Sequence, residues 1–127
     1  MRSVSVLIVD DFKRWREFAR STLETIPDLF IVAEASQGFE AVQKAGELQP
    51  DLVLLDIGLP GLNGLDVALH IGRSCQNSKI VFLNENDAPD IVEEALQLGA
   101  AGYVVKSHAG KELIPAIKQA LNGRLVV

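Results

Sequence analysis

LVLLDIGLPG, residues 52–61, is the stretch that decides the fold expected for this chain. Its four consecutive large apolar residues are typical of a strand covered on both faces, as central strands of parallel sheets are. Asp56 follows them directly, so the strand is expected to end at this carboxylate and a loop to begin. In open α/β sheets, ligands bind outside the carboxyl ends of the strands. Asp56 is therefore the first candidate for chemistry, and the structural alternative is an aspartate that only caps the following turn.

The rest of the chain alternates in the same way between apolar, β-branched runs and apolar residues at helical spacing. A helix is expected after each strand, within residues 12–26, 39–48, 64–72, 91–98 and 113–121. This (βα)5 series predicts one α/β domain over residues 1–127, with a parallel sheet, right-handed crossovers and helices on both faces. The expected strands are residues 4–9, 30–35 at a sheet edge, 52–55, 80–83 and 102–105.

Several residues indicate where the helices begin, end or bend. Ser36 is a plausible cap for the second helix, and Asp87 and Asp90 resemble a capping box around Pro89 at the start of the fourth. Pro115 lacks the amide proton that a helix interior uses. We therefore expect the fifth helix to begin late or to kink at that proline.

Composition limits the possible functions. The 127 residues are 48% hydrophobic, which is enough for one domain with its own core, and they carry a net charge of −5. Direct binding of nucleic acid or an anionic membrane is disfavoured, because both rest on an excess of Lys and Arg. Cys75 is the only cysteine, which excludes an internal disulfide and fits a cytoplasmic location. The apolar run at residues 4–9 is too short for a signal peptide or a membrane span.

Five polar residues follow strands of the expected sheet and should meet at one edge. Asp10 and Asp11 follow the first strand, Asp56 the third, Asn84 the fourth and Lys106 the fifth. Three neighbouring carboxylates repel one another unless positive charge lies among them. Hard oxygen ligands with room for water favour Mg²⁺, so the pattern predicts a divalent-ion site beside a lysine.

Such a site suits phosphoryl transfer. Positive charge can neutralise an incoming phosphoryl group while a carboxylate oxygen attacks phosphorus, which gives an acyl phosphate on aspartate. The structural alternative is that Asp10 and Asp11 cap the first helix and Lys106 pairs with them.

Three motifs occur together in the expected order: VLIVDD at residues 6–11, DLVLLD at residues 51–56, and GAAGYVVK at residues 99–106, with Leu59-Pro60 and Gly64 after the second. With these motifs, the chain resembles the receiver domain of bacterial two-component response regulators over essentially its whole length. The resemblance implies a flavodoxin-like, three-layer fold with strand order 2-1-3-4-5.

The resemblance also implies the metal ligands. Mg²⁺ would be held by Asp11, Asp56 and the backbone carbonyl of Gly58, and Asp10 would support it through water.

The roles of the other site residues follow from the same likeness. Asp56 would accept a phosphoryl group from a histidine kinase, and Lys106 would contact the phosphoryl oxygens. Tyr103 matches the switch aromatic, which turns inward when the phosphoryl group is present. The surface around the fourth helix, fifth strand and fifth helix would then change.

Two departures from the family pattern involve three positions. Asn84 stands where Thr or Ser is usual, with Glu85 where a small residue is usual, and Ser107 replaces a common proline after Lys106. The Asn84 amide can still donate a hydrogen bond, but its reach differs from that of a hydroxyl. Glu85 would disfavour phosphoryl entry if it pointed inward. These departures keep an alternative open, namely an atypical receiver that binds protein partners without phosphorylation.

An enzyme is the third class to consider. Phosphohydrolases that use an aspartyl phosphate carry a second aspartate two residues after the nucleophile, and Gly58 occupies that position here. We therefore expect no enzyme beyond slow self-catalysed phosphorylation and dephosphorylation.

The end of the chain suggests an output. Residues 120–127 resemble the point where many receivers pass into a linker and a helix-turn-helix domain. The expected partners are thus a histidine kinase, a DNA-binding output domain of the same protein or a downstream protein, and a second copy of the chain on activation. A stand-alone receiver is the runner-up.

Overall fold

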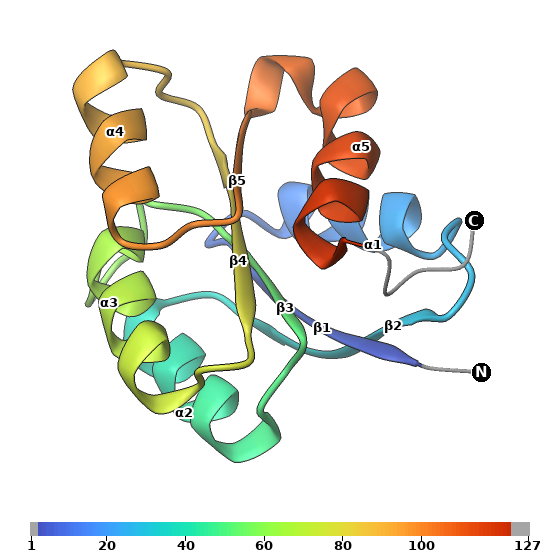
Figure 1. Ribbon diagram of the computed structural model, residues 1–127, viewed down its shortest axis with the longest axis horizontal. Coiled ribbons are helices and arrows are strands. Elements are labelled where there is room, and N and C mark those ends of the chain that lie inside the picture. The colour runs from blue at the N-terminus through green and yellow to red at the C-terminus, as the bar shows by residue number, and fades with distance from the viewer. Residues whose placement is uncertain (1–2, 123–127) are drawn as a thin grey trace.

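All strands that the structure describes lie parallel in a single sheet, in the order β2-β1-β3-β4-β5 (Figure 1). The structure is a computed structural model that describes residues 3–122. The predicted strand order and the predicted edge position of β2 are confirmed. Residues 123–127, which include most of the expected passage into a linker, lie outside the described residues. The strands are β1 (Val4–Val9), β2 (Leu29–Ala35), β3 (Leu52–Leu55), β4 (Lys79–Asn84) and β5 (Gly102–Val105).

Helices cover both faces of this sheet, which confirms the three-layer prediction. In Figure 1, α1 and α5 lie on one side of the sheet, and α2, α3 and α4 lie on the other. No helix within residues 3–122 has the length and apolar character needed to cross a membrane. The helices are α1 (Lys13–Leu23), α2 (Gly38–Leu48), α3 (Gly64–Ser74), α4 (Pro89–Gln97) and α5 (Ala109–Leu121), and a short 3-10 helix, η1 (Lys106–His108), precedes α5.

Strand β3 is buried on both faces, as its sequence predicts. Leu52 and Leu54 pack into the core that β1 shares with α1 and α5. Val53 and Leu55 point the other way, into the core beneath α2, α3 and α4. The alternation of side chains along a strand produces this division. Asp56 therefore follows the most enclosed part of the sheet.

The helix caps differ from the sequence prediction. Gln37, not Ser36, caps α2: its side-chain oxygen accepts a hydrogen bond from the Phe39 amide at 2.7 Å. Ser36 lies one residue too early, and its own amide donates to Glu40 Oε1 at 2.8 Å. Ala88 occupies the cap position of α4, and its side chain makes no hydrogen bond to the helix.

The predicted capping box of Asp87 and Asp90 is therefore wrong. The side chain of Asn86 accepts from the Ala88 amide instead, at 2.8 Å. Pro89 lies in the first turn of α4 as expected, where a missing amide proton costs nothing.

Of the two expectations for Pro115, a late start or a kink of α5, the late start is wrong. The helix begins at Ala109 and continues past Pro115 to Leu121. Pro115 is exposed, and Leu113 and Ile117 on either side of it are fully buried. Burial of this apolar face stabilises the helix enough to tolerate the backbone hydrogen bond that proline cannot make.

Candidate functional site

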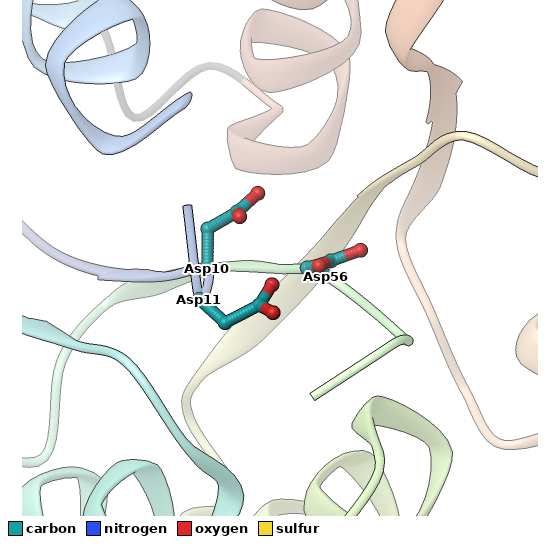
Figure 2. A group of neighbouring side chains, drawn as sticks. All are labelled: Asp10, Asp11 and Asp56. Atoms are coloured by element: carbon teal, nitrogen blue, oxygen red, sulfur yellow. The ribbon is translucent and has the colours of Figure 1, made fainter. Parts of the chain in front are cut away.

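Three aspartates meet at the carboxyl ends of β1 and β3. Asp10 and Asp11 follow β1, and Asp56 follows β3. One carboxylate oxygen from each lies within 4.8 Å of the other two, and Figure 2 shows the three side chains gathered at this edge of the sheet. Asp10 and Asp56 are buried, with exposed fractions of 3% and 5%, whereas Asp11 is exposed. The predicted cluster is therefore open to solvent on the Asp11 side only.

Lys106 supplies the positive charge within this cluster. Its Nζ lies 2.9 Å from Asp10 Oδ2 and 3.7 Å from Asp56 Oδ2, and its side chain is 4% exposed. The same ammonium group lies 4.9 Å from the centre of the Trp15 ring. Such partners offset the free-energy cost of burying an ammonium group. The alternative to a metal site, in which Asp10 and Asp11 cap the first helix and pair with Lys106, also predicts this contact between Lys106 and Asp10.

The helix-capping part of that alternative is not observed. Phe12 occupies the cap position of α1 and makes no side-chain cap. Asp10 Oδ1 accepts from the Phe12 amide at 2.9 Å, which closes a turn before the helix begins. Asp10 is thus held between this turn and Lys106, with its carboxylate facing the cluster.

The donor set fits Mg²⁺. Lys106 forms ion pairs with two of the three carboxylates, those of Asp10 and Asp56. The cluster of three therefore keeps excess negative charge at a partly open edge. Carboxylate oxygens are the ligands that Mg²⁺ takes in proteins, together with several waters. Gly58 lies in the loop that follows Asp56, and its backbone amide donates to the Asp56 carboxylate.

The environment of Asp56 favours its protonated form. Burial raises the pKa of Asp56, and the neighbouring Asp10 charge adds to this effect. Lys106 opposes both, and the result is a pKa of about 6, compared with an ordinary value of 3.8. Binding of a cation at the cluster would favour the ionised form, because cation ligands must be deprotonated.

We expect Asp56→Asn to stabilise the metal-free protein at neutral pH. The raised pKa means that, between pH 3.8 and about 6, the folded chain keeps a proton that the unfolded chain has lost. The free energy of unfolding of the native chain therefore falls by about 2–3 kcal/mol as the pH rises through this window. The variant has no carboxyl group at position 56 and does not lose this stability. Urea unfolding in EDTA at several pH values measures the difference between variant and native chain. That difference should vanish as the pH falls toward 3.8; a constant difference would contradict this prediction.

Asn84 joins the cluster to Tyr103 and to the loop after β4. Its Oδ1 accepts from the Ile57 amide at 3.4 Å, and its Nδ2 donates to the Tyr103 hydroxyl at 3.1 Å. The hydroxyl in turn donates to the Asn86 carbonyl at 2.5 Å. Burial raises the pKa of Tyr103, which keeps this donor protonated. The buried Asn84 amide is therefore engaged at both ends.

The other unusual positions lie outside this network. Glu85 and Ser107 are exposed to solvent. No cis peptide bond occurs in the part of the chain that the structure describes.

One residue that touches the cluster was missed by the sequence analysis. Arg16 Nη1 donates to the backbone carbonyl of Asp10 at 2.8 Å. The available signal was the pair Arg16 and Arg20, which lie four residues apart and therefore share one face of α1.

Comparison with known proteins places this chain in a family. The family model of the response regulator receiver domain matches residues 6–118. The nitrate/nitrite response regulator protein NarL of Escherichia coli K12 is 32% identical over 123 residues, which cover 97% of this chain and 57% of NarL. The response regulator UvrY of the same strain is 36% identical over 121 residues, or 95% of this chain and 56% of UvrY. The chain thus spans about half the length of these relatives.

A solved structure agrees with the fold. The signal receiver domain of a NarL response regulator from Mycobacterium tuberculosis has a TM-score of 0.88 and 31% identity, and the match covers 97% of this chain and 99% of that domain. A second solved structure, of a DNA-binding response regulator of the LuxR family from Staphylococcus aureus, has a TM-score of 0.87 and 28% identity, and the match covers 94% of this chain and 99% of that one. This chain belongs to the family of response regulator receiver domains.

Proposed function

We propose that this domain accepts a phosphoryl group from a histidine kinase on Asp56, in a Mg²⁺-dependent reaction, and thereby controls an output. The observation that carries the proposal is the cluster of three aspartates within 4.8 Å, with Lys106 buried among them. It combines a nucleophile, a place for a divalent ion and a fixed cation. These are the parts that phosphoryl transfer to a carboxylate needs.

The ligands for Mg²⁺ would be the carboxylates of Asp11 and Asp56 and the backbone carbonyl of Gly58, with Asp10 binding through water. When bound, the ion would supply positive charge that offsets the charge of the phosphoryl oxygens. Asp11 is the exposed member of the cluster. An ion entering from solvent would meet this carboxylate first.

Asp56 is the proposed nucleophile. One of its carboxylate oxygens would form a bond to phosphorus as the bond from phosphorus to the donor nitrogen breaks, and the electron pair would leave with the imidazole. Lys106, 3.7 Å from Asp56 Oδ2, would turn its ammonium group to the new phosphoryl oxygens. Its contact with Asp10 holds it in place beforehand. Transfer needs the ionised form of Asp56, which a cation at the site favours.

Asn84 and Tyr103 would carry the response to the surface. Asn84 would donate its amide to a phosphoryl oxygen, and this exchange would release the Tyr103 hydroxyl from the 3.1 Å contact it now makes. Because Tyr103 also binds the Asn86 carbonyl, a change at Asn84 reaches the loop before α4. The surface formed by α4, β5 and α5 would change as a result.

The output would lie in another part of the protein. We infer that residues 1–127 are the N-terminal receiver of a longer regulator, because the chain spans only about half of NarL and UvrY. Likeness to a DNA-binding response regulator of the LuxR family supports a DNA-binding output here, of the helix-turn-helix type. Two receivers would pair on activation. The alternative of a binding module that works without phosphorylation has no support in these comparisons, and we do not propose it.

Intact mass measurement after incubation with acetyl phosphate tests the proposal. We expect the native chain to gain one phosphoryl group with Mg²⁺ and none in EDTA, in samples quenched with acid at several times. Asn84→Thr, which places a hydroxyl at the end of β4, should also be labelled, at a different rate. Absence of labelling in both chains, despite Mg²⁺ binding, would contradict the proposal. Labelling of Asn84→Thr alone would favour the binding-module alternative.

A further inference from the structure

Arg16 links three segments of the fold at the edge of the acidic cluster. From α1, its Nε donates to Glu34 Oε1 of β2 at 3.0 Å, and its Nη1 donates to the Asp10 carbonyl at 2.8 Å. The Arg16 side chain is only 19% exposed. One guanidinium group therefore binds a carboxylate on the edge strand and the backbone of a cluster residue at the same time.

Every polar group of Asp10 is held by a neighbour. Its amide donates to the Ala35 carbonyl at 3.1 Å, its Oδ1 accepts from the Phe12 amide at 2.9 Å, and its Oδ2 lies 2.9 Å from Lys106 Nζ. The backbone carbonyl is the fourth group, and Arg16 is its partner. Loss of Arg16 would therefore remove the hydrogen bond that holds the carbonyl of the peptide unit between Asp10 and Asp11.

Glu34 holds Arg16 in the required orientation. Its carboxylate also accepts from Arg20 Nε at 2.9 Å and Nη2 at 2.6 Å, and its backbone carbonyl accepts from Lys44 Nζ at 2.6 Å. Burial raises the pKa of Glu34, but hydrogen bonds and charges from Arg20 and Arg16 outweigh it and hold the pKa below its usual value. Glu34 is thus an ionised anchor at neutral pH.

We infer that Arg16 is a positioning residue of the acidic cluster: it fixes the Asp10 peptide so that the Asp10 and Asp11 carboxylates face Asp56 together. The inference rests on the proposed Mg²⁺ site. Outer groups that orient metal ligands alter metal affinity without touching the ion. Arginine suits this task, because its planar donors point in fixed directions at two acceptors.

Arg20 provides a matched control within the same network. It lies one helical turn after Arg16, carries the same charge and binds the same carboxylate. Its guanidinium group donates to Glu34 and makes no hydrogen bond with Asp10, and its side chain is 40% exposed. Loss of Arg20 removes a cation and an ion pair but leaves the contact between Arg16 and Asp10 in place.

Calorimetric titration of the 127-residue chain with Mg²⁺ separates the two roles. We expect Arg16→Gln to bind Mg²⁺ about 10-fold more weakly than the native chain, and Arg20→Gln to keep close to native affinity. Arg16→Lys keeps the charge without the planar donors and should fall between native and Arg16→Gln. Urea unfolding of each variant shows whether the fold is kept. If Arg16→Gln does not fold, the Mg²⁺ affinity of Arg16→Lys is compared with that of the native chain instead.

The outcomes distinguish this inference from the proposed function. Native affinity in Arg16→Gln, or equal losses in Arg16→Gln and Arg20→Gln, would overturn the positioning role alone. If only Arg16→Lys folds, native affinity in that variant would overturn it. A native chain that binds no Mg²⁺ would overturn the proposed function and the inference together.

Discussion

Replacement of Asp56 by asparagine is expected to abolish phosphorylation of this chain. The amide has nearly the shape of the carboxylate but lacks the negative oxygen that attacks phosphorus. The same substitution removes a buried charge whose pKa is raised to about 6 by burial and by Asp10. The variant should therefore be folded, and at neutral pH more stable than the native chain. Loss of labelling could then be assigned to chemistry and not to unfolding.

An exposed aspartate supplies the control for this experiment. Asp66 lies in the first turn of α3, is exposed and has no contact with the cluster. Asp66→Asn changes the net charge by the same amount and should be labelled like the native chain. Intact mass after treatment with acetyl phosphate and Mg²⁺ measures both variants. A phosphoryl group on the Asp56→Asn variant, at the native rate, would mean that another residue is the acceptor.

The second large effect is expected from Gly64→Ala at the start of α3. A Cβ atom at Gly64 would lie 2.1 Å from the Asp56 carbonyl oxygen and 2.5 Å from the Ile57 Cα. Both are backbone atoms, so the helix or the strand end must move to make room. We expect a loss of about 3 kcal/mol in the free energy of unfolding. Slower labelling of Asp56 should accompany it, because the displaced segment carries the nucleophile.

Gly72 in the same helix is the matched control. A Cβ atom there meets no other atom within 4 Å. Gly72→Ala should therefore stabilise the chain by about 0.5–1 kcal/mol, because alanine favours helix more than glycine does. Urea unfolding measures the free energy of unfolding of both variants, and we expect the same dependence on urea concentration in each. Equal stability of Gly64→Ala and the native chain would contradict the close approach at Asp56.

Most of the fold could be predicted because continuous apolar runs in the sequence mark its strands. The run at residues 52–55 is apolar at every position, and both of its faces are buried. The convergence of Asp10, Asp56, Asn84 and Lys106 followed from the parallel sheet, because it needed only the strand ends and not the side-chain conformations. The sheet brings all four together in buried positions.

The local predictions that failed concern competition between neighbouring polar residues. Ser36 and Gln37 could each cap α2, and the point at which the chain leaves β2 decides in favour of Gln37. Phe39 and Leu48, at the two ends of the apolar spacing in α2, are 61% and 46% exposed. Ala41 and Ala45 face the core. The small residues let α2 approach the sheet closely, which hydrophobicity alone does not indicate.

The hydrogen-bond partners of Asn84 and Arg16 could not be predicted from the sequence, for a different reason. Asn84 stood out as unusual, but its two partners, Ile57 and Tyr103, depend on the placement of β3 and β5 on either side of β4. The contact between Arg16 and Asp10 requires the side-chain conformation that Glu34 imposes. Such contacts arise from three elements at once and leave no periodic pattern in the chain.

The central claim is that Asp56 is the phosphoacceptor, and mapping of the modified residue tests it most directly. Borohydride reduces an acyl phosphate to a primary alcohol, and peptide mass spectrometry then locates the changed side chain. After treatment with acetyl phosphate and Mg²⁺, we expect the change at Asp56 and at no other aspartate. A change at Asp10 or Asp11, or a phosphoryl group that resists borohydride because it is on His70 or His108, would contradict the account.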